Sequence, residues 1–272
     1  MATKPTKRKT QSEKIEEAQE NVLQMTQALL VETRRTFGAL QTAAHFAFRL
    51  REDGTVPVLF RDTIVNIALP FADFDRYQMT MLTSRKPAED SFLAQLTDLI
   101  PSLKGFNIID VGSFTGSTGI FLHKLLEAKK THLFEPQKVM QDALKATINA
   151  NPDIKGLELH NDVIDEDGHD ILLGTTRNEK LSETKYIRHD RGPLKSKSID
   201  SFKFTKVGLI NMDFSAPKIY ALRGAEKTIA KHRPILCIDR SARDIDETKE
   251  FLEPFDYKFV PTNGMMMIYL PK

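Results

Sequence analysis

The sequence predicts an α/β protein with a mostly parallel sheet, and three features of the chain lead to this prediction. From Phe106 onward, apolar runs typical of buried strands alternate with helical segments, as they do where right-handed crossovers join parallel strands. A glycine-rich turn at residues 112–119 joins the first of these strands to the next helix. The last two strands flank a turn at residues 261–264, and this hairpin places one antiparallel strand at the C-terminal end of the sheet.

The alternation predicts seven strands and four helices. The strands are expected at residues 106–111, 131–134, 157–161, 207–212, 235–239, 257–260 and 265–270. The helices are expected at residues 117–128, 138–150, 216–232 and 246–253. Residues 173–198 interrupt the alternation, because they are rich in Lys and Arg and poor in apolar residues. We expect them to form a long basic loop, which either covers the functional site and meets an anionic substrate or is an ordinary solvated loop.

Two different segments precede the sheet at the N-terminus. Residues 1–11 are basic and have few apolar side chains, so we expect a disordered tail rather than a contact with nucleic acid or a membrane. Residues 12–50 have apolar positions three and four apart, which predicts a helical extension of about 57 Å if it is straight. That length favours a coiled coil or helix exchange, for example in a homo-oligomer, and two shorter helices packed on their own domain are the alternative.

Residues 51–100 form a predicted hairpin and helix cap region. Asp53 and Gly54 mark a turn, and the apolar runs 56–60 and 63–69 could pair around Arg61 and Asp62. Residues 91–103 show an amphipathic helical pattern with Phe92, Leu96, Leu99 and Ile100 on one face. We expect the main domain to begin near Pro101 and to extend over residues 101–272.

Composition narrows the classes of function. The net charge of +2 makes the whole molecule a poor polyanion binder, and a single cysteine, Cys237, excludes an internal disulfide framework and a cysteine-rich zinc site. Its apolar surroundings in sequence predict a buried thiol. We expect no secretory signal and no membrane span, since neither pattern occurs, and a cytoplasmic protein as the default.

The glycine turn and the strand after it predict a nucleoside cofactor. Asp110 lies near the end of the first strand, and Gly112, Gly116 and Gly119 follow it, as in turns where a backbone approaches a ligand closely. Glu135 ends the second strand about 25 residues later. An acidic residue at that point is placed to accept hydrogen bonds from two ribose hydroxyl groups.

The ordered set of motifs resembles the FkbM-type S-adenosylmethionine-dependent methyltransferases over roughly residues 72–272. The resemblance rests on short runs at residues 84–89, 109–112, 134–136, 198–202, 210–213, 222–225 and 234–239. It implies the Rossmann-like fold of class I methyltransferases, S-adenosyl-L-methionine as cofactor, and a small-molecule hydroxyl acceptor such as a sugar.

The same resemblance suggests which residues hold the cofactor. Gly112 and Gly116 would allow backbone contact with its amino-acid and ribose portions, and Asp110 would orient the turn or meet the ammonium group through water. Asp162 would accept from the adenine amino group with Val163 beside the ring, and Glu89 would contact the methionine end. The alternatives are a solvated acidic turn at Asp162 and a carboxylate at a helix start for Glu89.

Catalysis would depend on Asp213, which ends the fourth predicted strand. Asp213 could take the acceptor proton, or cap the next helix instead. His189 in the basic loop is a second candidate base if that loop covers the site. Asp239 could join Asp213 at a metal, but two aspartates alone do not make such a site, and we predict none.

One departure from the family affects this function. The family continues its fourth strand as Asp-x-Glu-Gly-x-Glu, whereas this chain has Asp213-Phe-Ser-Ala-Pro-Lys218. We expect an O-methyltransferase for a sugar or other hydroxylated small molecule. One alternative is a methyltransferase-like interaction protein with weak or lost catalysis. The other is a nucleic-acid methyltransferase, which is disfavoured because the sequence lacks the Asn-Pro-Pro-Tyr, Asp-Pro-Pro-Tyr and Pro-Cys signatures.

Overall fold

The computed structural model describes residues 19–34, 36–38, 54–174, 181–240, 244–262 and 264–272. The chain divides into two units, Met1–Ala47 and Phe48–Lys272, and each is described by itself. In the first unit, residues 19–34 and 36–38 are helical, which confirms the predicted helix for these residues. The predicted tail and residues 12–18 and 39–50 of the predicted helix lie outside the described residues. The large apolar side chains of the described helix are exposed: Val22, Leu23, Met25, Leu29, Leu30, Val31 and Phe37.

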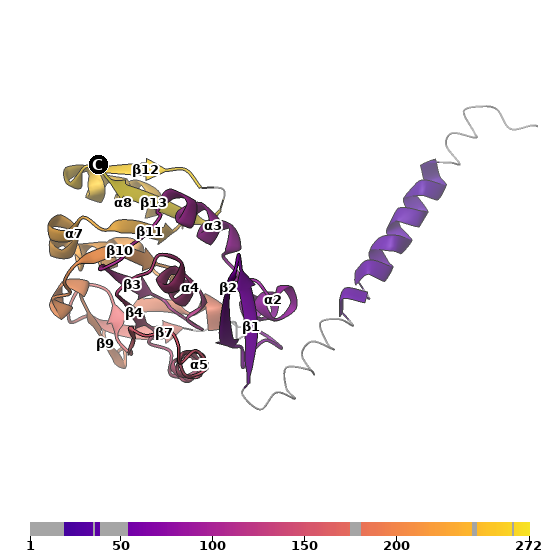
Figure 1. Ribbon diagram of the computed structural model, residues 1–272, viewed down its shortest axis with the longest axis horizontal. Coiled ribbons are helices and arrows are strands. Elements are labelled where there is room, and N and C mark those ends of the chain that lie inside the picture. Colours follow the sequence, from indigo (N-terminus) through magenta and orange to yellow (C-terminus); the bar gives the residue numbers. More distant parts are fainter. Residues whose placement is uncertain (1–18, 35, 39–53, 175–180, 241–243, 263) are drawn as a thin grey trace, which may run out of the picture. The chain divides into compact units, whose positions relative to one another are not determined.

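The second unit is built on the predicted seven-stranded sheet, with the order β12-β13-β11-β10-β3-β4-β5. Figure 1 shows β12, β13, β11, β10, β3 and β4 following one another across the sheet. Their bounds are β3 Asn107–Val111, β4 Lys130–Phe134, β5 Leu157–His160, β10 Val207–Met212, β11 Ile235–Asp239, β12 Tyr257–Val260 and β13 Met266–Pro271. Neighbouring strands are parallel except that β13 is antiparallel to both β11 and β12. The predicted fold class is confirmed.

In this order, the direction in which successive crossovers move across the sheet reverses at β3. The crossovers run from β3 outward to β4 and β5, and the chain then returns to β10 on the other side of β3. Open α/β sheets bind ligands at such a switch point, beyond the carboxyl ends of the strands. The carboxyl ends of β3, β4 and β10 are therefore the expected place for a site.

Helices connect the strands, and their bounds are α4 Ser117–Leu125, α5 Lys138–Asn149, α6 Lys218–Arg223, α7 Glu226–His232 and α8 Asp244–Leu252. The single helix predicted at residues 216–232 is wrong, since α6 and α7 are separated at Gly224. A Cβ at Gly224 would lie 2.3 Å from the carbonyl oxygen of Asp165, so the chain approaches another segment closely there. The Asp200 carboxylate accepts from the backbone N–H groups of Lys227 and Thr228 and so starts α7 separately.

The predicted hairpin is confirmed, with β1 Thr55–Phe60 paired to β2 Thr63–Ala68. It is fixed to α5, because the Thr147 hydroxyl accepts from the Ala68 amide at 3.0 Å and the Asn151 amide donates to the Asn66 carbonyl at 2.7 Å. Two helices follow, α2 Arg76–Ser84 and α3 Asp90–Leu99, and only α3 was predicted. On its predicted face Leu99 is 41% exposed, whereas the other members are buried.

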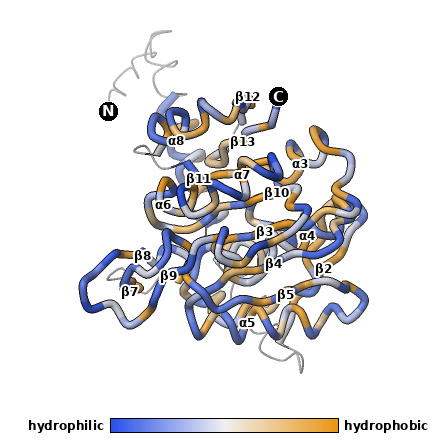
Figure 2. The backbone as a smooth tube through the Cα atoms, turned by 90° about the vertical axis from the view of Figure 1, so that its left-hand side faces the viewer, coloured by the Kyte–Doolittle hydropathy of each residue, from blue (hydrophilic) through white to orange (hydrophobic). Residues whose placement is uncertain are grey.

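A second, four-stranded sheet corrects the prediction of a basic loop at residues 173–198. Its order is β6-β9-β7-β8, with bounds β6 Val163–Ile164, β7 Asp170–Gly174, β8 Lys185–Arg188 and β9 Leu194–Lys197. Buried residues such as Ile171 and Tyr186 alternate with exposed ones, so its charged side chains occupy the solvent positions of strands. Figure 2 shows β7 and β8 as a largely hydrophilic projection at one side of the unit.

Short 3₁₀ segments complete the unit: η1 Leu181–Glu183, η2 Ile199–Phe202 and η3 Glu253–Phe255. Cys237 is buried within β11, and burial raises the pKa of its thiol, as expected for an inert side chain. Among the described residues, no helix combines the length and hydrophobicity that crossing a bilayer requires.

Candidate functional site

Two neighbouring cavities lie beyond the carboxyl ends of β3, β4 and β10. The inner cavity has a volume of about 160 Å³, and the outer cavity has a volume of about 780 Å³. The residues that line the inner cavity are Tyr77, Glu89, Asp110, Gly112, Ser113, Phe114, Thr118, Glu135, Gln137, Leu181, Ser182, Thr184, Tyr186, Asn211, Asp213, Phe214 and Ser215. Ser182, Tyr186 and residues 213–215 line both cavities. The two spaces therefore share one wall.

The glycine turn between β3 and α4 is shaped by contacts within the protein. Gly112 has a φ of +84°, and a Cβ there would lie 2.0 Å from the carbonyl oxygen of Asp213. Gly116 has a φ of +85°, and a Cβ there would lie 2.4 Å from Leu144. Both positions favour glycine for backbone conformation and for close packing. Gly112 lines the inner cavity, whereas Gly116 starts α4 and is not among the lining residues.

Glu135 joins the glycine turn to the start of α5. One carboxylate oxygen accepts from the Phe114 amide at 2.9 Å, and the other accepts from the Gln137 amide at 2.8 Å. The residue is 1% exposed, and burial raises its pKa from 4.5 to about 7 against the opposing effect of these two hydrogen bonds. Each oxygen still has a lone pair, so the group can accept further hydrogen bonds from a ligand.

Glu89 enters the cavity from the start of α3. The Tyr77 hydroxyl donates to its Oε2 at 2.6 Å, and the Thr118 hydroxyl donates to the same oxygen at 2.9 Å. Burial raises the pKa of Glu89, although both hydrogen bonds favour its charged form. Both hydroxyl groups therefore contact Oε2, and neither contacts Oε1.

Asp110 and Asn211 lie side by side on β3 and β10. The Asn211 amide donates to Asp110 Oδ1 at 2.7 Å. Within the described part of the chain, Asp110 Oδ2 and Asn211 Oδ1 are buried acceptors without a hydrogen-bond partner. Burial raises the pKa of Asp110. Unsatisfied buried acceptors are costly, so a ligand that donates hydrogen bonds here would stabilise the site.

Asp213 follows β10 at the wall between the two cavities. Among the described residues its carboxylate has no hydrogen-bond or ion-pair partner. Burial raises its pKa well above the usual value, and the neighbouring carboxyl groups of Glu89, Asp239 and Asp110 raise it further, whereas Lys218 lowers it. The inner cavity therefore gathers four carboxyl groups, those of Glu89, Asp110, Glu135 and Asp213.

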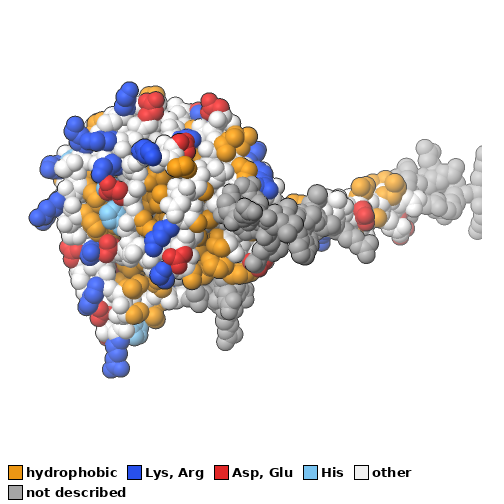
Figure 3. All heavy atoms as spheres, turned by 60° about the horizontal axis from the view of Figure 1, so that its bottom comes forward, with side chains coloured by type: hydrophobic (Ala, Val, Ile, Leu, Met, Phe, Trp, Pro, Cys, Tyr) orange, Lys and Arg blue, Asp and Glu red, His pale blue; other side chains and the backbone are white. Residues whose placement is uncertain are grey.

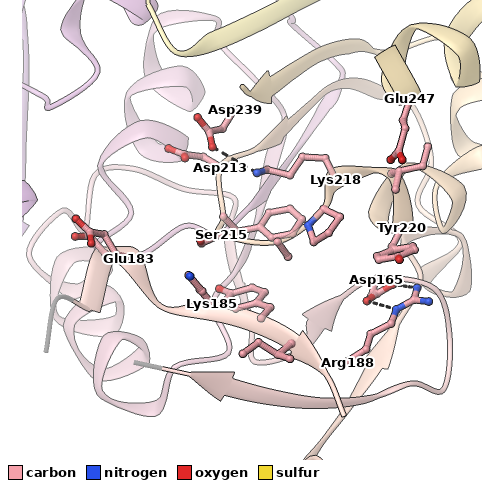
Figure 4. A pocket seen from close by; sticks show the side chains of 17 residues that line it. Asp165, Glu183, Lys185, Arg188, Asp213, Ser215, Lys218, Tyr220, Asp239 and Glu247 are labelled. Carbon is pink, nitrogen blue, oxygen red and sulfur yellow. Dashed lines mark hydrogen bonds and ion pairs between the residues drawn. The ribbon is translucent and has the colours of Figure 1, made fainter. Parts of the chain in front are cut away.

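The outer cavity is lined by residues of both signs. Figure 4 shows Asp213, Asp239 and the Lys218 ammonium group together at one end, and Arg188, Asp165 and Tyr220 at the other. Lys218 is 1% exposed, and its Nζ lies 3.4 Å from Asp239 Oδ2. The Arg188 guanidinium donates two hydrogen bonds to Asp165, one to each carboxylate oxygen. Its central carbon lies 3.6 Å from the centre of the Tyr220 ring.

The segment that includes η1 covers the inner cavity and is held by side chains of other elements. The Asp75 carboxylate accepts from the Ser182 amide at 3.0 Å. The Thr184 hydroxyl donates to Gln137 Oε1 at 2.8 Å, and Gln137 Nε2 donates to the Leu181 carbonyl at 3.3 Å. Tyr186 of β8 stacks on Phe214 with ring centres 5.5 Å apart. The second sheet thus contributes a wall to both cavities.

The structure brings together most of the acidic site residues predicted from sequence, and places three other residues elsewhere. Asp162 pairs with Lys197 at 2.9 Å, and Val163 is buried in the main core as part of β6. His189 is exposed in the turn between β8 and β9, where its Nδ1 accepts from the Arg191 amide. None of the three lines either cavity. Their proposed roles with adenine and as a base stay predictions.

Several residues of the inner cavity were not predicted, among them Tyr77, Thr118, Gln137, Thr184, Tyr186 and Asn211. Tyr77 lies on α2, which begins after Asp75, and the Asp75 side chain accepts from the Gln78 amide. An aspartate followed by a helical run is an N-cap signal that could have identified α2. No comparable signal in the sequence places Thr184 or Tyr186 at the site.

Comparisons with known proteins find only distant structural likenesses at low identity. No family model matches the chain, and no curated protein matches it. The FkbM methyltransferase of Methylobacillus flagellatus is similar with 16% identity and a TM-score of 0.45, over 73% of this chain and 56% of that one. The precorrin-6y C5,15-methyltransferase of Geobacter metallireducens is similar with 7% identity and a TM-score of 0.42, over 67% of this chain and 86% of that one.

A third similar structure is TrmK of M. capricolum in complex with S-adenosylhomocysteine. It has 10% identity and a TM-score of 0.38, over 66% of this chain and 68% of that one. This chain therefore spans little more than half of the Methylobacillus flagellatus protein and about two thirds of TrmK. These likenesses identify neither a substrate nor a catalytic residue.

The buried carboxyl groups predict a pH dependence of stability. Because the pKa of Glu135 is raised in the folded state, its contribution to stability is fully present below pH 4.5 and is lost as pH rises toward 7. A shift from 4.5 to about 7 corresponds to about 3 kcal/mol. We expect the melting temperature of the protein without ligand to fall between pH 5 and pH 8, and Glu135→Gln to make this fall smaller. A melting temperature that rises over this range, or an equal fall in the variant, would contradict the assignment.

Proposed function

We propose that this protein is an S-adenosylmethionine-dependent methyltransferase and that its inner cavity, of about 160 Å³, holds part of the cofactor. The observation that supports this most directly is the charge of the cavity. Four carboxyl groups line it, and none of its described lining residues is a lysine or an arginine. S-adenosylmethionine carries a sulfonium and an ammonium group against one carboxylate, so it is a net cation. A dinucleotide with two pyrophosphate charges would meet repulsion here.

The polar groups of the cavity fit the parts of this cofactor. Glu135 has lone pairs left to accept from ribose hydroxyl groups after its two backbone contacts. Asp110 and Asn211 line the cavity with acceptor oxygens, and an ammonium group is a triple donor. Glu89, fixed by Tyr77 and Thr118, supplies a further acceptor. Gly112 and Phe114 form the turn beside these groups.

We assign the acceptor molecule to the outer cavity. Asp213 lies at the shared wall, where a reacting hydroxyl could approach it from the larger space. When bound, the cofactor supplies an electrophilic methyl group. The bond from sulfur to that methyl would break as the bond to the acceptor oxygen formed, and Asp213 would accept the hydroxyl proton. The thioether product is S-adenosylhomocysteine.

The acceptor class proposed is a sugar or another hydroxylated small molecule, as the resemblance to FkbM-type enzymes implies. The outer cavity offers both acceptors and donors for hydroxyl groups, among them Asp239, Lys185 and Tyr220. Its volume of about 780 Å³ is within the usual range for small-molecule sites. The family's Glu-Gly-x-Glu positions are replaced here, and Lys218 now pairs with Asp239 in this cavity.

Two other functions would use the same fold. On the face shown in Figure 3, Lys and Arg side chains are interspersed with Asp and Glu and do not form a continuous basic patch, which does not favour a nucleic-acid acceptor on that face. An interaction protein with weak catalysis is supported by the exposed apolar side chains of residues 22–37 and by the Lys218 replacement.

Calorimetric titration with S-adenosylmethionine, S-adenosylhomocysteine and nicotinamide adenine dinucleotide tests the cofactor assignment. We expect saturable binding of the first two at micromolar concentrations and none of the third. Absence of heat with S-adenosylmethionine at millimolar concentration would refute the proposal. Transfer of labelled methyl groups to fractions of a cell extract then separates an active enzyme from an interaction protein, which would bind the cofactor without turnover.

A further inference from the structure

Three side chains outside the two cavities meet at the edge of the main sheet. His132 lies on β4, and Glu158 and His160 lie on the neighbouring edge strand β5. Residues His132 and Glu158 are paired in register, and His160 is two residues further along the same face of β5. The arrangement is formed by two rigid strands rather than by a loop.

We propose that His132, Glu158 and His160 form a binding site for a divalent transition metal ion, with Zn²⁺ as the preferred ion. His132 Nδ1 lies 3.1 Å from His160 Nε2 and 3.2 Å from Glu158 Oε2. One ligand atom from each residue can be chosen so that all three lie within 4.8 Å of one another. In the described part of the chain, no other group of three or more His, Cys, Asp or Glu residues meets this condition.

These separations match those of a tetrahedral ion. Zinc binds imidazole nitrogen and carboxylate oxygen at about 2.0–2.2 Å, which places neighbouring ligand atoms of a tetrahedron about 3.3 Å apart. Both measured separations are close to that value. Two imidazoles and one carboxylate also occur at zinc sites that keep a fourth position for water or another ligand.

Hydrogen bonds within the protein satisfy this cluster only in part. His132 Nδ1 faces both the ring nitrogen of His160 and the carboxylate of Glu158. If His132 Nδ1 carries a proton, His160 Nε2 and Glu158 Oε2 are both acceptors for that one proton. If His160 Nε2 carries the proton instead, it can donate to His132 Nδ1, but the lone pair of that nitrogen then also faces the Glu158 carboxylate. A cation at the centre of the three atoms would bind all of them at once.

The surroundings keep the imidazoles available for a metal. His132 is 5% exposed, its ring centre lies 4.2 Å from that of Phe204, and the ring of His160 stacks on Phe134 at 4.5 Å. The Lys130 ammonium group pairs with Glu158 Oε1 and leaves Oε2 on the side of His132.

A metal here would have a structural effect on the inner cavity. It would fasten the edge strand β5 to β4 by side chains, beyond the backbone ladder. The His160 carbonyl accepts from the amide of Glu135 at 3.0 Å, so the same strand end positions the carboxyl group at the glycine turn. The ion would stabilise this corner without contact with the proposed reactants.

Titration of the untagged protein with Zn²⁺ and with Co²⁺ tests the proposal. We expect one equivalent of Zn²⁺ to bind, the melting temperature to rise with it, and bound Co²⁺ to show the visible absorption of a tetrahedral complex. His160→Gln and Glu158→Gln should each weaken binding by at least about 100-fold, since loss of a group that merely supports a ligand already costs 10- to 100-fold.

His169→Gln is the matched control. His169 Nε2 lies 3.7 Å from a carboxylate oxygen of Glu166, so this pair has one imidazole and one carboxylate but no second imidazole. This variant should bind Zn²⁺ as the unmodified protein does. The proposal is refuted if no saturable binding occurs, if His160→Gln binds equally well, or if His169→Gln loses binding to the same extent. None of these readouts depends on S-adenosylmethionine, so they stand apart from the proposed function.

Discussion

Replacing Glu135 with glutamine is expected to weaken S-adenosylmethionine binding by at least about 100-fold. Each hydrogen bond to a charged group contributes about 1.5–3 kcal/mol, and a tenfold change in affinity corresponds to about 1.4 kcal/mol. The amide also directs an NH₂ group at the Phe114 or Gln137 amide, where the carboxylate now accepts from both. Loss of the ribose contact and distortion of the turn therefore act in the same direction. Calorimetric titration measures the change.

Asp200→Asn is the control for this variant. The Asp200 carboxylate also accepts from two backbone N–H groups at a helix start, but it does not line the inner or the outer cavity. We expect it to lower the melting temperature without a change in cofactor affinity. If both variants lose affinity equally, the effect of Glu135 is only structural. If Glu135→Gln binds as tightly as the unmodified protein, the assigned position of the cofactor is wrong.

The central strands β3, β4, β10 and β11 were predictable because each is a short, largely apolar run whose side chains are mostly buried. The predicted bounds 207–212, 235–239 and 257–260 agree with those of β10, β11 and β12. Acidic groups at strand ends were predictable for the same reason, since Glu135 and Asp213 directly follow such runs and Asp110 is the residue before the last of β3. Their meeting in one cavity follows from the parallel order β10-β3-β4.

The second sheet was not predictable from hydrophobicity. In β8 only Tyr186 is buried, and Lys185, Ile187 and Arg188 occupy exposed or half-exposed positions. Strands of this length with charged solvent faces resemble a polar loop in sequence. The same segment explains the position of Val163, since the chain turns into β6 directly after Asp162 and carries that side chain into the core.

The inner cavity depends on contacts between residues distant in sequence. Tyr77 reaches Glu89 across two helices, and the Thr184 hydroxyl meets Gln137 across 47 positions of the chain. Sequence patterns describe one element at a time, so they do not predict such pairs. The fold brings the carboxyl groups of Glu89, Asp110, Glu135 and Asp213 together in the inner cavity. When charged they repel one another, and this repulsion favours a cationic ligand.

Asp213→Asn is expected to lower the rate of methyl transfer by about 100- to 10,000-fold, the usual range for loss of a general base. The change removes the proposed proton acceptor at the wall shared by the two cavities and keeps the shape of the side chain. Single-turnover transfer of a labelled methyl group to an extract fraction that the unmodified protein methylates gives the rate. Asp190→Asn, which changes an exposed carboxylate in the turn after β8, should keep the normal rate. An unchanged rate in Asp213→Asn would contradict this role.

The raised pKa of Asp213 explains why the base would act only with the cofactor present. Burial and the carboxyl groups of Glu89, Asp239 and Asp110 disfavour its charged form in the protein alone. A sulfonium cation in the inner cavity would oppose these effects and favour the Asp213 carboxylate. If Asp213 then took the acceptor proton as the sulfonium became a neutral thioether, one positive and one negative charge would be lost together. Asparagine cannot accept that proton, so the variant should lose this compensation.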